Sequence, residues 1–199
     1  RLVGSEMCIR DRGNQGVSAE DIPVVAFSVG EEELSGIDTA PLVGHMAAWN
    51  YFMSEETPEN EAFIKAWHDY IGDTKRVTND PMEAHYIGFN MWVKAVEAAG
   101  TTDTDKVIDA MVGVEVPNLT GGTSTMLPNH HITKPVLIGE IQDDGQFLTV
   151  SSTEELVPGD AWSDYLPGSK DLISDWSAPT QCGNYNTKTK QCLGSKAMQ

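Results

Sequence analysis

The chain has 199 residues, and its 40% hydrophobic content is ordinary for a globular protein that is large enough to bury a core. Thirty acidic and thirteen basic residues give a formal net charge of −17. Such a negative surface repels phosphate groups, so we expect neither nucleic-acid binding nor attachment to anionic lipid. The longest apolar stretch, residues 42–53, is interrupted by His45 and Asn50 and is shorter than the roughly 20 residues of a membrane helix, so we expect no membrane insertion.

Residues 1–12 differ in character from the rest of the chain. They resemble a translated sequencing adapter, and they lack both the apolar core and the small-residue cleavage site of a secretion signal. We therefore expect a non-native leader over residues 1–12, with the folded part beginning at residue 13. A short, disordered natural leader is the alternative.

Two short strands are predicted near the start of the folded part. Residues 22–27 form an apolar run with β-branched members, which is typical of a buried parallel strand. Residues 28–33 follow it and carry three glutamates. Because loops after strand ends face the ligand crevice in open α/β sheets, these residues are a candidate cleft loop. The alternative is a helix whose first turn is acidic. Residues 43–52 predict a second strand.

Three helices are expected next. The first begins at Thr57-Pro58 and presents an apolar face for packing, made of Phe63, Ile64, Trp67, Tyr70 and Ile71. The third covers about residues 102–112 and ends at Gly113.

The second helix has the clearest start and stop signals. Asp80 is the expected N-cap, Pro81 suits the first helical position, Glu83 completes a capping box, and Gly100 ends the helix. The residues expected to be buried recur at helical spacing: Met82, Tyr86, Phe89, Val93 and Val96.

The last third of the chain changes from helix to strand and then to an irregular tail. Residues 121–125 predict a flexible loop, and two strands at 135–141 and 146–150 flank the turn signal Asp143-Asp144-Gly145, which indicates a hairpin. We expect the folded part to end at residue 157 and residues 158–199 to form an irregular wrap or tail. Cys182 and Cys192 in that tail can form a disulfide in an oxidising compartment; two free thiols are the alternative.

Four blocks of sequence, in order, carry a family resemblance. They are IPVVAFSVGEEEL at 22–34, VGHMAAWNYF at 43–52, DPMEAHYIGFNMW at 80–92, and a last block with STM at 124–126, NHH at 129–131, KPVLIGEI at 134–141 and DGQF at 144–147. From about residue 21 to 166 the chain resembles the C-terminal part of a urea ABC-transporter substrate-binding protein. That family of type I periplasmic binding proteins also includes branched-chain amino-acid and amide receptors.

The resemblance implies an α/β fold, as the C-terminal part of two lobes that close on a ligand, with a closing β-hairpin and an irregular C-terminal tail. The N-terminal lobe is then missing, so we expect this chain to be a fragment of a periplasmic protein whose signal peptide was lost with that lobe. The implied partners are urea or a short-chain amide and an ABC permease in the inner membrane. No cofactor is implied.

The same resemblance predicts the ligand-binding residues. His45 falls where amino-acid receptors place a carboxylate for the ligand's ammonium, and a neutral imidazole suits an uncharged ligand; a locally bonded histidine is the alternative. Glu83 and Met82 fall at the start of a helix that faces the cleft, although capping and packing also explain them. Trp49 is a cleft wall or a core residue. With these four, the expected set includes Ser28, Glu31 and Met46.

Enzymatic activity is not expected. Neighbouring strand residues point to opposite faces, so His130 and His131 make a poor metal site, and the sequence has no G-x-S-x-G elbow, P-loop or zincin motif. Three alternatives to urea or amide uptake remain. They are an amide-sensing regulator of the same fold, a branched-chain amino-acid binding protein, and an amide hydrolase that uses Glu83 or His45 in acid–base chemistry.

Overall fold

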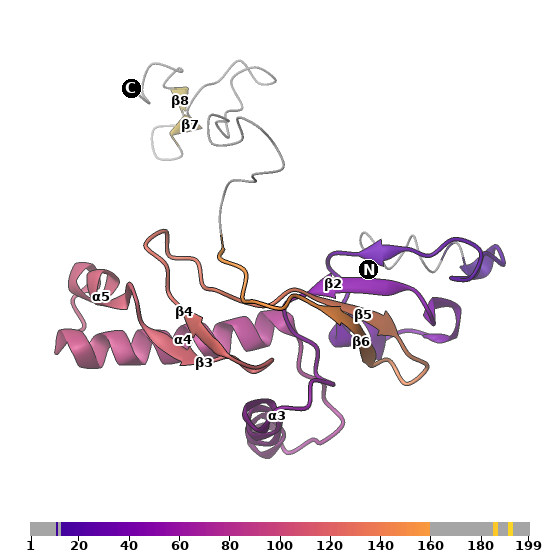
Figure 1. Ribbon diagram of the computed structural model, residues 1–199, viewed down its shortest axis with the longest axis horizontal. Helices are drawn as coiled ribbons and strands as arrows, with labels where there is room; N and C mark the ends of the chain where they lie inside the picture. The colour runs from indigo at the N-terminus through magenta and orange to yellow at the C-terminus, as the bar shows by residue number, and fades with distance from the viewer. Residues whose placement is uncertain (1–10, 12, 160–184, 187–190, 193–199) are drawn as a thin grey trace. The chain divides into compact units, whose positions relative to one another are not determined.

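A computed structural model describes residues 11, 13–159, 185–186 and 191–192 of the chain. The chain divides into two units, residues 1–159 and 160–199. The first unit has the expected α/β architecture: a four-stranded sheet joined to a group of helices and a small hairpin (Figure 1).

The main sheet has the strand order β1-β2-β5-β6, formed by β1 (Val25–Ala26), β2 (Met46–Trp49), β5 (Leu137–Ile141) and β6 (Phe147–Ser152) (Figure 1). The β1 and β2 strands are parallel, while β5 is antiparallel to both of its neighbours. Strand β5 alternates between buried and half-buried residues, as expected for a central strand. The predicted hairpin over residues 135–150 is confirmed as β5 and β6.

The hydrophobic core that packs against this sheet is formed by side chains of its strands, of the short helix α2 (Glu31–Ser35) and of the 3-10 turn η1 (Ala40–Leu42). Its buried members include Ala26, Leu34, Ala47, Leu137 and Ile141. Phe52 and Phe147 stack with ring centroids 4.4 Å apart. Gly139 is required beneath them, because a Cβ there would lie 2.6 Å from Phe52 Cε2.

The helical part contains α3 (Pro58–Ile71), α4 (Asp80–Ala99) and α5 (Thr104–Met111), with the hairpin of β3 (Glu115–Pro117) and β4 (Thr123–Thr125). Local signals fix the helix ends. The Thr57 side chain caps α3, and Gly72 and Gly100 end α3 and α4 in the left-handed conformation. One core joins α4 to the hairpin through Ile87, Met91, Val116 and Met126.

Several sequence predictions for the helices are wrong in detail. The N-cap of α4 is Asn79, whose side chain accepts from the Met82 N–H, so the capping box of Asp80 and Glu83 does not form. The buried face of α4 is Glu83, Ile87, Met91 and Ala95. Tyr86 and Phe89 are 44% and 61% exposed, because the β3–β4 hairpin packs on the other stripe. On α3, Phe63 is buried but Tyr70 is 86% exposed.

The strands and loops also differ from expectation. The first strand is parallel as predicted but only two residues long, and Ile22 and Phe27 at its flanks are exposed. The second is shorter than residues 43–52. The predicted loop at 121–125 contains β4, and only its glycines, Gly121 and Gly122, have positive φ.

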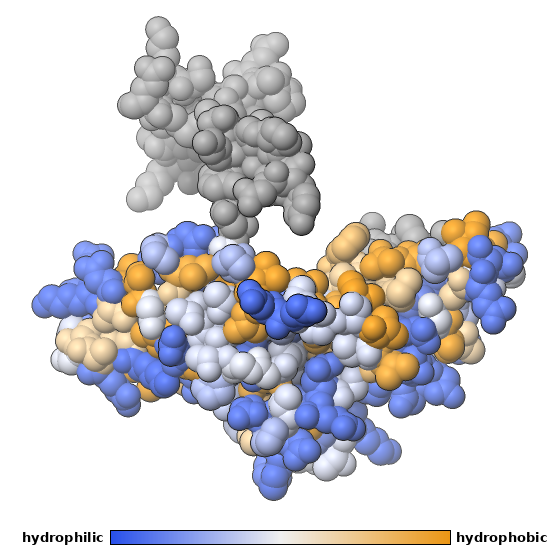
Figure 2. All heavy atoms as spheres, in the orientation of Figure 1, coloured by the Kyte–Doolittle hydropathy of each residue, from blue (hydrophilic) through white to orange (hydrophobic). Residues whose placement is uncertain are grey.

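Apolar side chains reach the surface on the outer strands of the sheet. Figure 2 shows apolar surface over this region, at the right of the view; Phe27 is 75% exposed, Leu148 56% and Val150 50%. This surface agrees with a chain that covers part of a larger fold.

In the tail, the backbone of β7 (Tyr185–Asn186) pairs antiparallel with β8 (Gln191–Cys192). Cys182 lies outside the described residues, so the disulfide with Cys192 stays a prediction, as do the boundaries at residues 12 and 157. Among the helices of the described residues, none has the length and apolarity to cross a membrane.

Candidate functional site

Two connections carry the chain between the main sheet and the helices. We call residues 50–57, from β2 to α3, the outgoing connection, and residues 126–136, from β4 to β5, the return connection. Asn50 links them directly, because its Nδ2 donates to the Pro135 carbonyl at 2.6 Å. Both connections meet the first turn of α4, where charged side chains gather.

Four of these charged residues form what we call the junction cluster: Glu31, Asp80, Glu83 and Lys134. The outgoing connection is bonded to two of them. The Asn50 N–H donates to Asp80 Oδ1 at 3.1 Å, and the Met53 N–H donates to Glu31 Oε1 at 2.6 Å. The carboxyl ends of β1 and β2 therefore face the N-terminus of α4, the arrangement in which open α/β sheets bind ligands.

The Glu83–Lys134 pair joins α4 to the return connection. Lys134 Nζ donates to Glu83 Oε2, and the two side chains are 10% and 0% exposed. Burial raises the pKa of Glu83 to about 7, while the charge of Lys134 opposes this shift and the charge of Asp80 adds to it. Burial also raises the pKa of Asp80, against the charge of Lys134 and the Asn50 N–H.

Glu31 is the second buried acid of the cluster and has no cation beside it among the described residues. Burial raises its pKa to about 7, the Met53 N–H opposes the shift, and Asp80 and Glu33 add to it. Glu31 is 1% exposed, and its Oε2 has no hydrogen-bond partner in the described part of the chain. A buried carboxylate oxygen in this state is an acceptor that a donor can still occupy.

A neutral polar network supports the outgoing connection next to this cluster. The Tyr51 hydroxyl lies 2.7 Å from Asn60 Oδ1 and 2.7 Å from Thr78 Oγ1. Tyr51 is fully buried, and burial raises the pKa of its hydroxyl. This bonding fixes the position of the backbone between Asn50 and Met53.

Of the predicted site residues, Glu31 and Glu83 come together in the junction cluster. Ser28 is exposed in the bend that follows β1. Trp49 is half-buried against the sheet core, and its Nε1 donates to the Val29 carbonyl at 2.7 Å, which favours the core alternative. Met82 packs against Tyr51, Phe63 and Leu119.

His45 and Met46 lie at the other end of β2, about four residues or roughly 13 Å of strand from Asn50. The His45 side chain is fully buried, and its Nδ1 accepts from the Val24 N–H at 3.1 Å. The Met46 N–H donates to the Val24 carbonyl at 2.9 Å. This geometry favours the local hydrogen-bonding alternative for His45.

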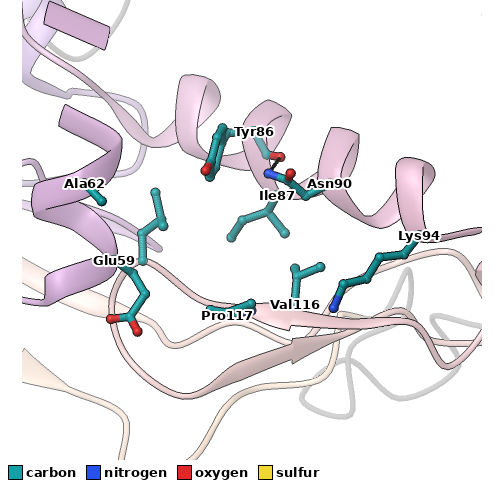
Figure 3. A pocket seen from close by; sticks show the side chains of 9 residues that line it. Glu59, Ala62, Tyr86, Ile87, Asn90, Lys94, Val116 and Pro117 are labelled. Carbon is teal, nitrogen blue, oxygen red and sulfur yellow. Dashed lines mark hydrogen bonds between the residues drawn. The ribbon is translucent and has the colours of Figure 1, made fainter. Parts of the chain in front are cut away.

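A separate pocket of about 300 Å³ lies between α3, α4 and β3 (Figure 3). Its walls are mainly apolar, with Ile87 and Val116 among them, and none of the predicted site residues lines it. Two polar groups at its edge are already bonded within the chain: Asn90 Nδ2 to the Tyr86 carbonyl at 2.8 Å, and Lys94 Nζ to the Glu115 carbonyl at 2.7 Å. Its mainly apolar walls suit a small polar ligand less well than the carboxyl groups of the junction do.

Sequence reasoning missed the part that Asn50, Asp80 and Lys134 play at the junction. A signal for Lys134 was present, because it is the only lysine or arginine between Lys106 and Lys170. Its partner was not predictable, since Glu83 is 51 positions away and already had a local explanation. Among the described residues, no group of three or more His, Cys, Asp or Glu side chains is arranged to hold a metal.

Comparisons with known proteins agree with this architecture. The family model described as periplasmic binding protein domain matches residues 5–168. A limonene hydroxylase of Geobacillus stearothermophilus is 31% identical over 115 residues, 58% of this chain and 21% of that protein. The Leu/Ile/Val-binding protein homolog 6 of Brucella abortus is 28% identical over 108 residues, 53% of this chain and 27% of that protein.

Solved structures show the same fold. An ABC-transporter solute-binding protein of Rhodopseudomonas palustris HaA2, in complex with p-hydroxybenzoic acid, has a TM-score of 0.64 at 24% identity, over 75% of this chain and 42% of that one. An amino-acid ABC-transporter substrate-binding protein of Pseudomonas fluorescens Pf-5 has a TM-score of 0.63 at 22% identity, over 81% and 43%. The chain thus spans less than half the length of these relatives.

Proposed function

This chain belongs to the periplasmic binding protein domain family, and we propose that it is part of the solute-binding component of an ABC uptake system. The observation that carries the proposal is the junction cluster, where the carboxyl ends of β1 and β2 meet the first turn of α4. Its Glu31 presents a buried carboxylate oxygen without a described partner. In this proposal the protein works in the periplasm, together with a membrane permease, and has no catalytic role.

The charge of the cluster supports a neutral ligand rich in N–H donors, such as urea or a short-chain amide. The cluster holds three carboxyl groups, those of Glu31, Asp80 and Glu83, and one ammonium, that of Lys134, which is bonded to Glu83. A carboxylate ligand would add negative charge to this group, whereas urea brings only N–H donors and one carbonyl acceptor. An N–H group that reached Glu31 Oε2 would satisfy an acceptor that otherwise remains buried without a bond.

A branched-chain amino acid is the second candidate ligand, because the excess of acidic groups also suits an ammonium. One of the relatives is named as a Leu/Ile/Val-binding protein homolog, which supports this alternative. The carboxylate of an amino acid would then need donors other than these acids. An amide-sensing regulator of the same fold would use the same cluster without a permease.

The proposed ligand contacts are Ser28, Glu31, Trp49, Met82 and Glu83, on the junction side of the sheet. His45 and Met46 remain predictions from the family resemblance. Their position at the start of β2 makes a supporting role in the sheet the competing explanation.

Titration calorimetry with urea, acetamide, leucine and p-hydroxybenzoate tests the proposal. We expect saturable heat with urea or acetamide for the complete product of the gene, and none for the 199-residue chain, which lacks contacts from the rest of the fold. In the complete product, Glu31→Gln should weaken binding, and Glu56→Gln, at an exposed position, should not.

Each outcome of the calorimetry has a defined meaning. Binding of leucine or p-hydroxybenzoate without urea or acetamide would overturn the amide ligand. Absence of binding to all four compounds, or full binding by the 199-residue chain alone, would contradict the proposal of a two-lobed solute trap. Release of ammonia during incubation with urea or acetamide would favour a hydrolase, and we expect none.

A further inference from the structure

We propose that Lys134 is a positioning residue that fastens the return connection to the first turn of α4, while Asp80 fastens the outgoing connection to the same turn. One helical turn then controls the position of both connections between the sheet and the helices. Its relevance to ligand binding rests on the proposed function, because Met82 and Glu83 in that turn are proposed ligand contacts. The clamp itself can be tested without any ligand.

The hydrogen bonds of the two connections support this assignment. Asp80 and Glu83 are three positions apart on one face of α4, and each bonds a different connection: Asp80 the Asn50 N–H, and Glu83 the Lys134 ammonium. The bond from Asn50 Nδ2 to the Pro135 carbonyl closes the triangle. Local chain geometry does not explain these contacts, because 30, 51 and 85 positions separate the partners.

Because the Glu83–Lys134 ion pair is buried, breaking it should cost more stability than breaking an exposed pair. Exposed ion pairs contribute little to stability, whereas removing one partner of a buried pair leaves an uncompensated charge. The Lys134 side chain is 10% exposed and that of Glu83 is 0% exposed, whereas the i,i+4 pair of Lys65 and Asp69 is 74% and 66% exposed. The chain therefore contains its own matched control.

The groups around the clamp make it sensitive to protons. Glu83 faces Lys134 from the return connection, Asp80 from its own helix, and the Tyr51 hydroxyl from the outgoing connection. Glu31 of α2 also acts on Tyr51 and is affected by Asp80. Because burial raises the pKa of Glu83 in the closed clamp, the closed clamp holds a proton more tightly than the open one, so the clamp should weaken as the pH rises toward about 7.

Amide hydrogen exchange of the 199-residue chain, measured as protection at the N–H groups of Asn50 and residue 134, tests the clamp. The first N–H donates to Asp80 and the second to the Val157 carbonyl at 3.0 Å. In Lys134→Met we expect about tenfold less protection at both positions, the factor that corresponds to one lost charge-assisted hydrogen bond. Lys134→Arg should restore most of it, and Lys65→Met should match the unmodified chain.

Loss of protection at residue 134 alone would overturn the proposal, because it would show an ion pair that supports only its own segment. Unchanged protection at both positions would overturn it as well. If Lys134→Met does not fold, the double variant Glu83→Gln/Lys134→Met leaves neither charge unpaired and replaces it in the measurement. The clamp requires reduced protection at both positions in that variant, and protection equal to the unmodified chain would refute it.

A pH series separates the clamp from a passive structural role. Protection at Asn50 should decrease in the unmodified chain as the pH is raised from about 4.5 to about 7, and this change should be absent in Glu83→Gln. A pH profile that is the same in both proteins would contradict the proposal. These measurements use no ligand, so a failed urea titration would leave them unaffected.

Discussion

The backbone N–H of Asn50 donates a hydrogen bond to Asp80 Oδ1 at 3.1 Å, although 30 positions and all of helix α3 separate the two residues. Asp80 is therefore occupied by a distant partner, and its neighbour Asn79 caps the helix instead. Adjacent residues at one helix end thus have different tasks: Asn79 satisfies the local backbone, and Asp80 attaches another segment of the chain.

This division can be tested at position 80. Asp80→Ala should lower the free energy of unfolding by about 1 to 3 kcal/mol, because it leaves the Asn50 N–H without its acceptor. Asp80→Asn keeps a side-chain oxygen and should retain most of the stability. It should also lower the pKa of Glu31 by removing a nearby negative charge, as NMR titration of that carboxyl can measure. Equal losses in both variants would indicate that the charge matters rather than the acceptor.

The stability of the chain should depend on pH through Glu31. Its pKa is raised from 4.5 to about 7 by burial, so the folded state holds the proton more tightly than the unfolded state. The free energy of unfolding should therefore be highest below about pH 4.5 for this group and should fall as the pH rises to about 7. The expected loss is on the order of 3 kcal/mol, and Glu83 should act in the same direction.

Urea unfolding at pH 5 and pH 8 measures this effect. Glu31→Gln should be more stable than the unmodified chain at pH 8 and should have a flatter pH profile. Glu56→Gln, at an exposed position, is the matched control and should leave the profile as it was. If the free energy of unfolding of Glu31→Gln depended on pH as steeply as that of the control, the Glu31 carboxyl would not be the source of the pH dependence.

Tyr51→Phe should destabilise the outgoing connection. The change removes a buried hydroxyl that lies 2.7 Å from both Asn60 Oδ1 and Thr78 Oγ1, and the expected cost is about 1 to 3 kcal/mol. Tyr70→Phe on the exposed side of α3 should change the free energy of unfolding by less than about 0.5 kcal/mol. Denaturant unfolding of both variants measures these free energies. Equal losses in the two variants would contradict a stabilising role of the Tyr51 hydrogen bonds.

Two glycines should respond in opposite ways to alanine. In Gly139→Ala the new Cβ would meet Phe52 Cε2 at 2.6 Å and Phe147 Cβ at 3.0 Å, so we expect overpacking that costs about 1 to 3 kcal/mol. Gly88 lies inside α4 with nothing within 4 Å of the new atom, and Gly88→Ala should stabilise the chain by up to about 1 kcal/mol. Thermal unfolding should show shifts of opposite sign.

Signals that act within a few residues allowed part of the fold to be predicted. The turn at Asp144-Gly145 gave the hairpin of β5 and β6, Thr57 and Pro58 gave the start of α3, and Gly100 gave the end of α4. In each case the residue type itself favours the conformation that the backbone adopts. The general α/β class was implied by the family resemblance.

Features that depend on distant partners were not predictable in the same way. Helix α4 has two apolar stripes at helical spacing, one with Tyr86 and Phe89 and one with Ile87 and Met91. Periodicity cannot choose between them. The hairpin of β3 and β4 packs on the second stripe, and the part of it that contains β4, residues 121–125, was expected to be a loop. The capping role predicted for Glu83 was wrong for the same reason, because its actual partner, Lys134, is remote in sequence.

The pairing of β2 with β5 has a consequence for how the chain folds. Trp49 lies opposite Leu137 in that pair, so the central pairing of the sheet encloses the whole helical excursion between them. Closing so long a loop carries an entropic penalty that local helix contacts do not repay, and high contact order slows folding. Helices α3 to α5 should therefore form before the sheet is complete, and the pairing of β2 with β5 should be a late step of folding.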